Sequence, residues 1–267
     1  MGVKPTEAEA MDDQTGTGLP ASIEAAWGVR ARPNKGPRPA LSLERIVAAA
    51  VRVAAADGLQ AVSMSRVATD LGVSTMSLYR YVAAKDELLA LMADLAYEPP
   101  PRLAPGEGWR RSLERWACAE LAVYRRNPWV LRIPVRGAPT TPNQVTWLEW
   151  GLASLAGTGL REDEKLSVIL LLTGYVRNQA TLEADVAAAM AAGVAGAQSM
   201  TSYGRTLARL TDPERFPALH AAIAAGVLDA PEGEVGEDDL DGEFSFGLER
   251  VLDGIETLIE NRRTGHG

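Results

Sequence analysis

The chain has 267 residues, 46% of them hydrophobic, which is enough apolar material for a substantial core and argues against a disordered protein. One cysteine and two histidines exclude an intramolecular disulfide and leave little material for a metal site, so we expect no metal and no cofactor. The net charge of −8 reflects one segment, because residues 228–243 hold eight acidic residues and no basic one.

The sequence predicts neither export nor membrane insertion. The N-terminus lacks the apolar core of a signal peptide, and the longest apolar run, residues 166–176, is far shorter than a membrane span. We therefore expect a soluble, cytoplasmic protein with no membrane segment. Residues 28–97 carry nine basic and six acidic residues, so this part of the chain can still bind a polyanion.

Residues 1–40 are rich in glycine, proline and polar residues and show no sustained hydrophobic period. We therefore predict a flexible arm, in which residues 22–27 could form one helical turn. The arm ends in four basic residues among three prolines: Arg30, Arg32, Lys35 and Arg38. These are either part of a solvated linker or a basic arm that contacts a DNA groove or phosphates.

From residue 41 onward the sequence favours helices, and it contains no alternating Val, Ile and Thr runs with hairpin turns. We therefore predict an all-α fold. Ser42 and Ser63 are residues of the type that caps helix N-termini, and Gly58 ends the first helix. Helices are expected over residues 42–57, 63–71, 74–82 and 86–97, and they define a first domain, residues 41–98.

Residues 63–82 join two short helices through a glycine-containing turn, which is typical of a helix-turn-helix motif. Leu78 and Val82 are spaced to pack inward. The outer face then consists of Thr75, Met76, Tyr79 and Arg80. Such a face suits the edges of DNA bases, and Tyr79 and Lys85 are natural phosphate partners. The alternative is a helical hairpin that only packs, which would leave Tyr79 and Arg80 outward without a purpose.

Residues 41–97 resemble the DNA-binding domain of the tetracycline-repressor (TetR/AcrR) family, through LSLERIVAAAVRVAAADGLQAVSMSRVATDLGVS and SLYRYVAAKDELLALM. The resemblance implies that the short third helix reads the major groove. It implies base contacts from Thr75, Met76, Ser77 and Arg80, with Ser74 at the start of the same helix. It implies phosphate contacts from Tyr79, Tyr81 and Lys85. Ser65 falls where some members use a longer side chain to reach a base.

The same resemblance extends to the end of the chain, where FSFGLERVLDGIETLI, residues 244–259, is similar to the last helix of the family's ligand-binding domain. It implies a homodimer that releases DNA when a small molecule enters the C-terminal domain. Two recognition helices related by a dyad require a palindromic double-stranded DNA operator. We therefore expect a DNA-binding transcriptional regulator that acts as a repressor.

The second domain, residues 99–267, is expected to hold the small-molecule effector between helices. These helices are predicted over residues 108–126, 128–135, 142–156, 162–190, 198–210, 213–224 and 244–262. Aromatic walls with a few polar groups describe a ligand site. The candidates are Trp116, Glu120, Tyr124, Trp147, Trp150, Tyr175, Asn178 and Gln179. The tryptophans could equally fill the core, and Glu120 could be a surface carboxylate. Asn178 and Gln179 are the better candidates, because buried amides without partners are costly.

The final helix carries an apolar stripe too wide for packing within one domain, so we expect it to contact a second copy of the chain. The predicted dimer residues are Phe246, Val251, Ile255, Leu258 and Ile259. Residues 228–243 before it are expected to form an acidic, disordered loop. Cys118 is expected to be a small packed thiol.

Catalysis finds little support in the sequence. There is no glycine-rich phosphate loop, no G-x-S-x-G and no H-E-x-x-H pattern, and His220 has no visible nucleophile beside it. We therefore expect no enzyme. The alternatives that stay open are a helical regulator whose C-terminal domain binds a protein partner or no ligand, and an all-helical enzyme without a recognisable motif.

Overall fold

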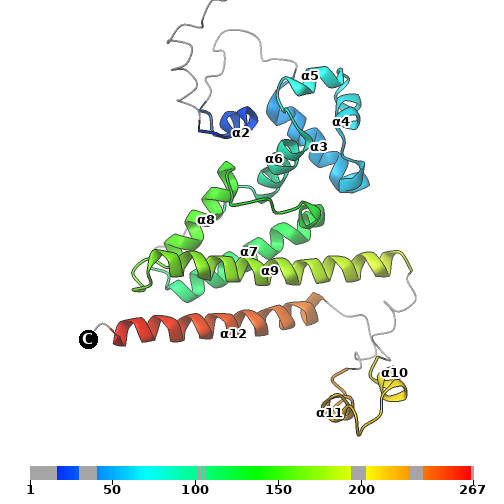
Figure 1. Ribbon diagram of the computed structural model, residues 1–267, viewed down its shortest axis with the longest axis vertical. Helices are drawn as coiled ribbons and strands as arrows, with labels where there is room; N and C mark the ends of the chain where they lie inside the picture. Colours follow the sequence, from blue (N-terminus) through cyan, green and yellow to red (C-terminus); the bar gives the residue numbers. More distant parts are fainter. Residues whose placement is uncertain are drawn as a thin grey trace, which may run out of the picture. The chain divides into compact units, whose positions relative to one another are not determined.

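A computed structural model of the chain describes residues 17–29, 41–100, 104, 106–193, 203–228 and 237–265. Every regular element in these ranges is helical (Figure 1), which confirms the predicted all-α fold. The described residues fall into two compact units, one within residues 1–107 and 122–154, the other within residues 108–121 and 155–267. No helix in the described part of the chain is long and apolar enough to cross a membrane.

The first unit contains the predicted four-helix segment. Its helices are α3 (Leu43–Asp57), α4 (Met64–Leu71), α5 (Thr75–Tyr79) and α6 (Lys85–Tyr97). Ser42 and Ser63 cap α3 and α4, because their side chains accept hydrogen bonds from Arg45 N and Arg66 N. Gly72 ends α4 in the left-handed conformation, which a residue without Cβ adopts at little cost. The short 3₁₀ helix η2 (Leu59–Ala61) links α3 to α4.

The predicted arm contains an ordered helix, α2 (Ala21–Ala26), which packs on α6. Ser22, Ile23 and Glu24 are buried, and the indole Nε1 of Trp27 donates to Thr140 O. The helical turn predicted at residues 22–27 is therefore confirmed, whereas the prediction of one flexible arm over residues 1–40 is wrong for this stretch, because the turn is docked on α6. Six residues give no recognisable period, and tertiary contacts order them. The basic residues Arg30, Arg32, Lys35 and Arg38 lie outside the described residues, and their contact with DNA stays a prediction.

The remainder of the first unit follows α6 in the chain. It comprises the C-terminal end of α7 (Trp109–Arg126), the 3₁₀ helix η3 (Pro128–Arg132) and α8 (Pro142–Ser154). Residues 128–135 were predicted as a regular helix, but the structure has only this short 3₁₀ segment. Helix α8 lies against α6 and brings two tryptophans to it.

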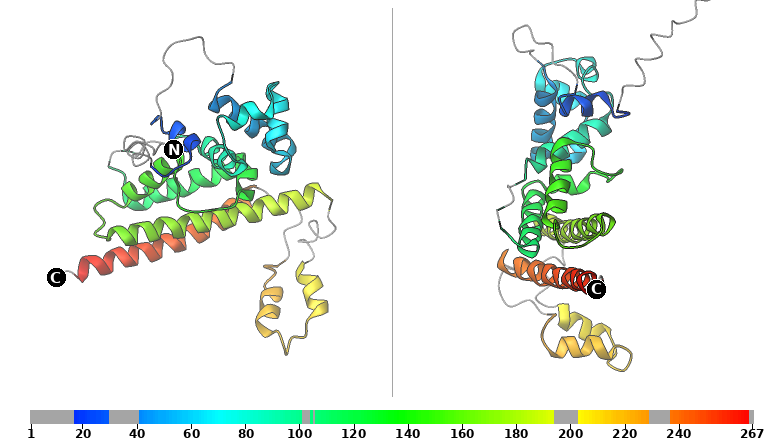
Figure 2. Two further views of the ribbon diagram at one scale, coloured as in Figure 1. Left: turned by 45° about the horizontal axis from the view of Figure 1, so that its top comes forward. Right: turned by 90° about the vertical axis from the view of Figure 1, so that its left-hand side faces the viewer.

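The second unit is built on two long antiparallel helices, α9 (Glu162–Ala191) and α12 (Glu237–Thr264), which lie side by side in Figures 1 and 2. Arg262 near the end of α12 pairs with Glu164 near the start of α9. At the opposite end, the Tyr175 ring stacks on Phe244 and its hydroxyl donates to Phe244 O at 2.7 Å. These two contacts fix the antiparallel register.

Gly247 makes the close approach of α9 and α12 possible. A Cβ on Gly247 would lie 2.8 Å from Tyr175 Cζ, a separation that real Cβ atoms do not show. The N-terminal part of α7 joins the same unit, where Arg110 pairs with Asp253 and Glu256 of α12. Cys118 of α7 is exposed, so the expectation of a packed thiol is wrong.

In the chain, α9 and α12 are separated by two short helices, α10 (Tyr203–Leu210) and α11 (Pro217–Ala224), which pack against each other as a hairpin. Helix α12 begins at Glu237, so its first seven residues, 237–243, fall in the segment predicted as an acidic disordered loop. That prediction is therefore wrong for residues 237–243. Its acidic residues open a helix, and the partial positive charge at a helix N-terminus favours acidic residues there.

Candidate nucleic-acid interface and aromatic site

The predicted recognition element is α5, a short helix held by two buried apolar residues, one within it and one three residues beyond its end. Leu78 and Val82 are fully buried, as their spacing predicts. Ser74 occupies the N-cap position in an extended conformation, and its hydroxyl lies 2.9 Å from that of Ser77. The helix is shorter than predicted, but Val82 N still bonds Leu78 O, so a final helical turn continues beyond Tyr79.

The opposite face of α5 points to solvent. Met76 is 73% exposed, Tyr79 is 45% exposed, and Arg80 is exposed beside them. Thr75 and Ser77 are half-buried at the edge of this face. An exposed methionine and tyrosine contribute no folding energy where they stand, whereas a thymine methyl or a phosphate would give them a contact. We call Thr75, Met76, Ser77, Tyr79 and Arg80 the reading face.

The cations around the reading face fall into two groups. Arg52 and Arg66 pair with Asp70 and Asp57 at 2.9 and 2.8 Å. Arg80 and Lys85 are exposed and make no ion pair with any residue in the described ranges. Lys85 is the first residue of α6, where backbone N–H groups also favour phosphate.

The two remaining predicted contacts have local partners. The Tyr81 hydroxyl donates to Leu41 O at 3.0 Å and so ties the start of α3 to the end of the recognition element. The Ser65 hydroxyl lies 3.2 Å from that of Ser63, on the exposed side of α4. Both side chains remain at the surface.

An aromatic cluster lies at the C-terminal end of α6. Its members are Tyr97, Tyr124, Trp147 and Trp150. Tyr97 packs edge-on against Tyr124 and Trp147, with ring centroids 6.0 and 5.6 Å apart, and the Tyr97 and Tyr124 hydroxyls share a hydrogen bond of 2.6 Å. Trp147 lies 5.5 Å from Trp150 and donates its indole N–H to Glu98 O. Sequence reasoning missed Tyr97, whose only signal is an aromatic ring at the last helical residue before three prolines.

A buried carboxylate provides a second link between α6 and α8. Asp94, 8% exposed, accepts hydrogen bonds from Asn143 N and Gln144 N at 2.8 and 3.1 Å, so a residue of α6 caps the N-terminus of α8. The Asn143 side chain donates in return to Asp94 O. Burial raises the pKa of Asp94 above its ordinary value, and the hydrogen bonds that the carboxylate accepts only partly oppose this shift.

The other predicted effector residues belong to the second unit. Trp116 and Glu120 are buried on α7. Tyr175 is partly buried against α12, and desolvation raises the pKa of its phenol. Asn178 is exposed, so the expectation that it is a buried amide is wrong. The Gln179 amide donates to Glu183 at 3.3 Å. The structure thus brings Tyr124, Trp147 and Trp150 together in the first unit and places the other five residues in the second.

The predicted dimer residues of α12 divide by burial. Ile255 and Ile259 are buried within the protomer, whereas Phe246 is 65% exposed and Val251 and Leu258 are half-buried. Helix α9 carries a larger exposed apolar surface that sequence reasoning missed: Leu166, Leu170, Leu171, Leu182, Val186 and Met190. All of them except Leu171 are spaced by multiples of four, which is a signal visible in the sequence, but a long helix rich in leucine is also typical of a buried core helix.

Comparison with known proteins agrees with this arrangement. Residues 46–92 match the family model described as bacterial regulatory proteins, tetR family, and residues 101–259 match the model of the tetracyclin repressor-like C-terminal domain. The HTH-type transcriptional repressor DrrR1 of Streptomyces coeruleorubidus is 37% identical over 262 residues, which cover 94% of this chain and 91% of DrrR1.

Solved structures show the same fold. Apo ActR from Streptomyces coelicolor aligns with a TM-score of 0.68 at 23% identity, over 86% of this chain and 100% of that one. ActR in complex with actinorhodin aligns with a TM-score of 0.65 at 26% identity, over 82% and 96%. With both domain models matched in order and a relative aligned over nearly the whole length, the chain belongs to the tetracycline-repressor family of helix-turn-helix transcriptional regulators.

Proposed function

We propose that the protein is a homodimeric repressor that binds a palindromic operator through the reading face and is released by a small apolar or aromatic effector. The observation that carries this proposal is the contrast within residues 75–82, where Leu78 and Val82 are fully buried while Met76 is 73% exposed. A five-residue helix fixed so firmly from behind presents its outer side chains in one orientation, which base recognition requires.

The reading face divides by chemistry into base and phosphate contacts. Arg80 can donate two hydrogen bonds to guanine, and Met76 can contact a thymine methyl. Ser74, Thr75 and Ser77 have hydroxyls that reach base edges or sugar oxygens. Tyr79 and Lys85 can donate hydrogen bonds to phosphates of the DNA backbone. Tyr81 must give up its bond to Leu41 O before it can donate to a phosphate, and Ser65 is too short to extend far from α4. We therefore expect these two to contribute least.

The dimer interface is proposed on α9 together with the exposed part of α12. Leu166, Leu170, Leu182, Val186 and Met190 recur at multiples of four along α9, in a row that winds slowly around the helix, so that neighbouring members of the row share a face. Gly174 and Asn178 complete the row, and both are exposed. Such rows pack into the grooves of a facing helix, and a glycine at the centre lets two backbones approach. Asn178 then contributes to the interface, where an amide can pair with its own copy across a two-fold axis.

Dimerisation places two recognition elements on one face of the DNA. Because an isologous interface repeats every contact, the half-sites are inverted copies separated by about one helical turn, roughly 34 Å. Phe246, Val251 and Leu258 add apolar surface from α12, while Ile255 and Ile259 support that surface from within the protomer.

The effector is proposed to act through the aromatic cluster. Tyr124, Trp147 and Trp150 are buried, and Trp147 bonds the end of α6 directly. A ligand that displaces Trp147 or shifts α8 must also move Glu98, which ends the helix that begins at Lys85, or Asp94 within that helix. A solved relative binds a small molecule, ActR with actinorhodin, which supports a ligand-responsive C-terminal domain. The contribution of Trp116, Glu120, Tyr175, Asn178 and Gln179 to ligand binding stays a prediction.

Selection from a random double-stranded DNA library tests the DNA-binding part. The full-length protein at about 0.1 M salt should enrich an inverted repeat, and a variant with Arg80→Ala should relax one base position in each half. Enrichment of no symmetric sequence would contradict the proposal.

A ligand screen tests the effector part. Small aromatic compounds that quench tryptophan fluorescence should also weaken operator binding, and the operator should weaken their binding by the same factor. Trp147→Phe keeps a ring but removes the bond to Glu98 O, so it should reduce this coupling. A compound that binds equally well with and without operator would show that the C-terminal domain responds to something else, such as a protein.

A further inference from the structure

The N-terminal segment of residues 17–29, here called the strap, has no place in the function described so far. Its helix α2 is only six residues long, and a helix of that length is not stable in water by itself. Its order therefore comes from docking: Ile23 is 3% exposed, and Ser22 and Glu24 are buried beside it. The Thr17 hydroxyl and amide both donate to Glu24 Oε1, which folds the start of the strap onto α2.

One end of the strap contacts the beginning of α6. The Ser22 hydroxyl donates to Glu87 Oε2 at 2.6 Å, and the same carboxylate oxygen accepts a bond from Ala83 N at 3.2 Å. Glu87 thus joins the strap to the turn of residues 82–85, which connects the recognition helix to α6. Lys85, the proposed phosphate contact, is the last residue of this turn.

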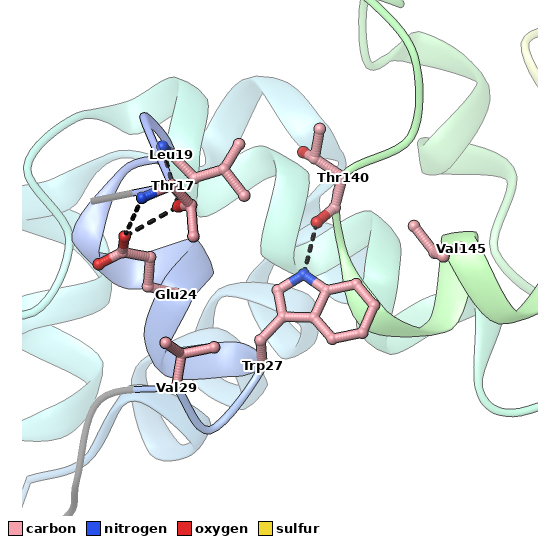
Figure 3. Close-up of a pocket in the computed structure, with 7 residues that line it drawn as sticks. All are labelled: Thr17, Leu19, Glu24, Trp27, Val29, Thr140 and Val145. Carbon is pink, nitrogen blue, oxygen red and sulfur yellow. Dashed lines mark hydrogen bonds between the residues drawn. The ribbon is translucent and has the colours of Figure 1, made fainter. Parts of the chain in front are cut away.

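The other end of the strap contacts the segment that leads into α8. The Trp27 indole donates to Thr140 O at 2.7 Å, and its ring lies close to Val145. Figure 3 shows the small pocket at this contact, about 290 Å³ in volume, which is lined largely by apolar groups of the strap and of residues 140–145.

We propose that the strap is a positioning element for DNA binding, which fixes the turn of residues 82–85 so that Lys85 meets the DNA backbone without further ordering. This inference rests on the proposed DNA contact of Lys85. A loop that is ordered before binding does not lose conformational freedom on binding, and affinity rises accordingly. Ser22 and Ile23 do not touch DNA in this account. They act through Glu87 and the backbone at Ala83.

The experiment compares full-length variants for operator binding by fluorescence anisotropy. Ser22→Ala removes the hydroxyl donor and should weaken binding about threefold, whereas Ile23→Asp should undock α2 and weaken it about tenfold or more. Ala21→Ser, an exposed change on the same helix, is the matched control and should have no effect. Hydrogen exchange should show that α2 loses protection in Ile23→Asp while α3 and α6 keep theirs. If α3 and α6 also lose protection, Ile23→Asp has disturbed the whole unit, and the test then rests on the operator affinity of Ser22→Ala.

A double-mutant cycle distinguishes positioning from general stabilisation. If the strap acts through the turn, Ser22→Ala should have no further effect once Lys85→Ala has removed the contact. Additive losses would overturn the inference, and so would strap variants that bind as tightly as the unmodified protein while Lys85→Ala binds more weakly. That second outcome leaves the proposed function intact. If Lys85→Ala has no effect, the phosphate contact itself is wrong and the strap inference falls with it.

Discussion

Asp94 of α6 caps the N-terminus of α8, and substitutions at Asp94 give the sharpest test of how α6 and α8 are joined. Asp94→Ala removes the acceptor for the N–H groups of Asn143 and Gln144. At about 1–3 kcal/mol for each buried donor left without a partner, the loss of unfolding free energy is about 2–6 kcal/mol. We expect the lower half of that range, because a helix N-terminus can admit water.

Asp94→Asn is the matched control. Both backbone donors bond the same carboxylate oxygen, Oδ1, and an amide oxygen in its place can accept both. The substitution also removes the cost of burying a charge. We therefore expect its stability at pH 7 to lie within about 1 kcal/mol of the unmodified protein.

The pH dependence has a definite sign. Burial raises the pKa of Asp94 above 3.8, so the native state favours the protonated carboxyl. The stability that this proton contributes is complete below pH 3.8 and is lost as the pH rises through the raised native pKa. Relative to the unmodified protein, Asp94→Asn should therefore gain stability with rising pH and then reach a plateau.

Denaturant unfolding followed by circular dichroism measures these differences, at one protein concentration so that the proposed dimerisation contributes equally to every variant. The other carboxylates are common to both proteins, so the difference isolates Asp94. The reasoning is refuted if Asp94→Asn is as damaging as Asp94→Ala at pH 7, or if its relative stability falls as the pH rises.

Three further outcomes are expected. Lys85→Ala should weaken binding to all DNA sequences alike and reduce the log–log salt slope by about 0.9, measured by anisotropy over a salt series; an unchanged slope would remove Lys85 from the phosphate contacts. Leu170→Glu, at a side chain 75% exposed, should give a mass near 28.5 kDa in light scattering, whereas Leu210→Glu, 76% exposed on α10, should leave the dimer intact. Gly247→Ala should lower the melting temperature because its Cβ meets Tyr175, and Tyr175→Leu in the same chain should restore part of the loss; a melting temperature unchanged by Gly247→Ala would show that the helices can separate freely.

The sequence was most informative where local signals agree with one another. Ser42, Ser63 and Gly72 bound α3 and α4 by cap chemistry, and the spacing of Leu78 and Val82 orients α5. These signals depend on a few neighbouring residues, so they can be read without knowing the tertiary structure. The reading face follows from them, since the side chains that do not pack inward must point outward.

Signals failed where distant contacts decide the conformation. Helix α2 is ordered by Glu87 and Thr140, which lie far away in the chain. The apolar stripe of α12 identifies a buried face but not the helix that covers it. Ile259 was therefore predicted as a dimer residue, although it is buried within a single protomer. Asn178 shows the converse: within a leucine-rich helix it was expected to be buried, yet it lies on the exposed side.

The exposed position of Cys118 makes the protein a ready subject for thiol-specific spectroscopy. Because the chain has no other cysteine, a maleimide dye or a nitroxide attaches at one position on α7 without any substitution. A symmetric dimer then carries two identical labels, whose separation gives a single distance in pulsed electron paramagnetic resonance. Recording that distance before and after adding operator DNA would test whether the C-terminal domains move on DNA binding, with every proposed DNA-contacting residue left unchanged.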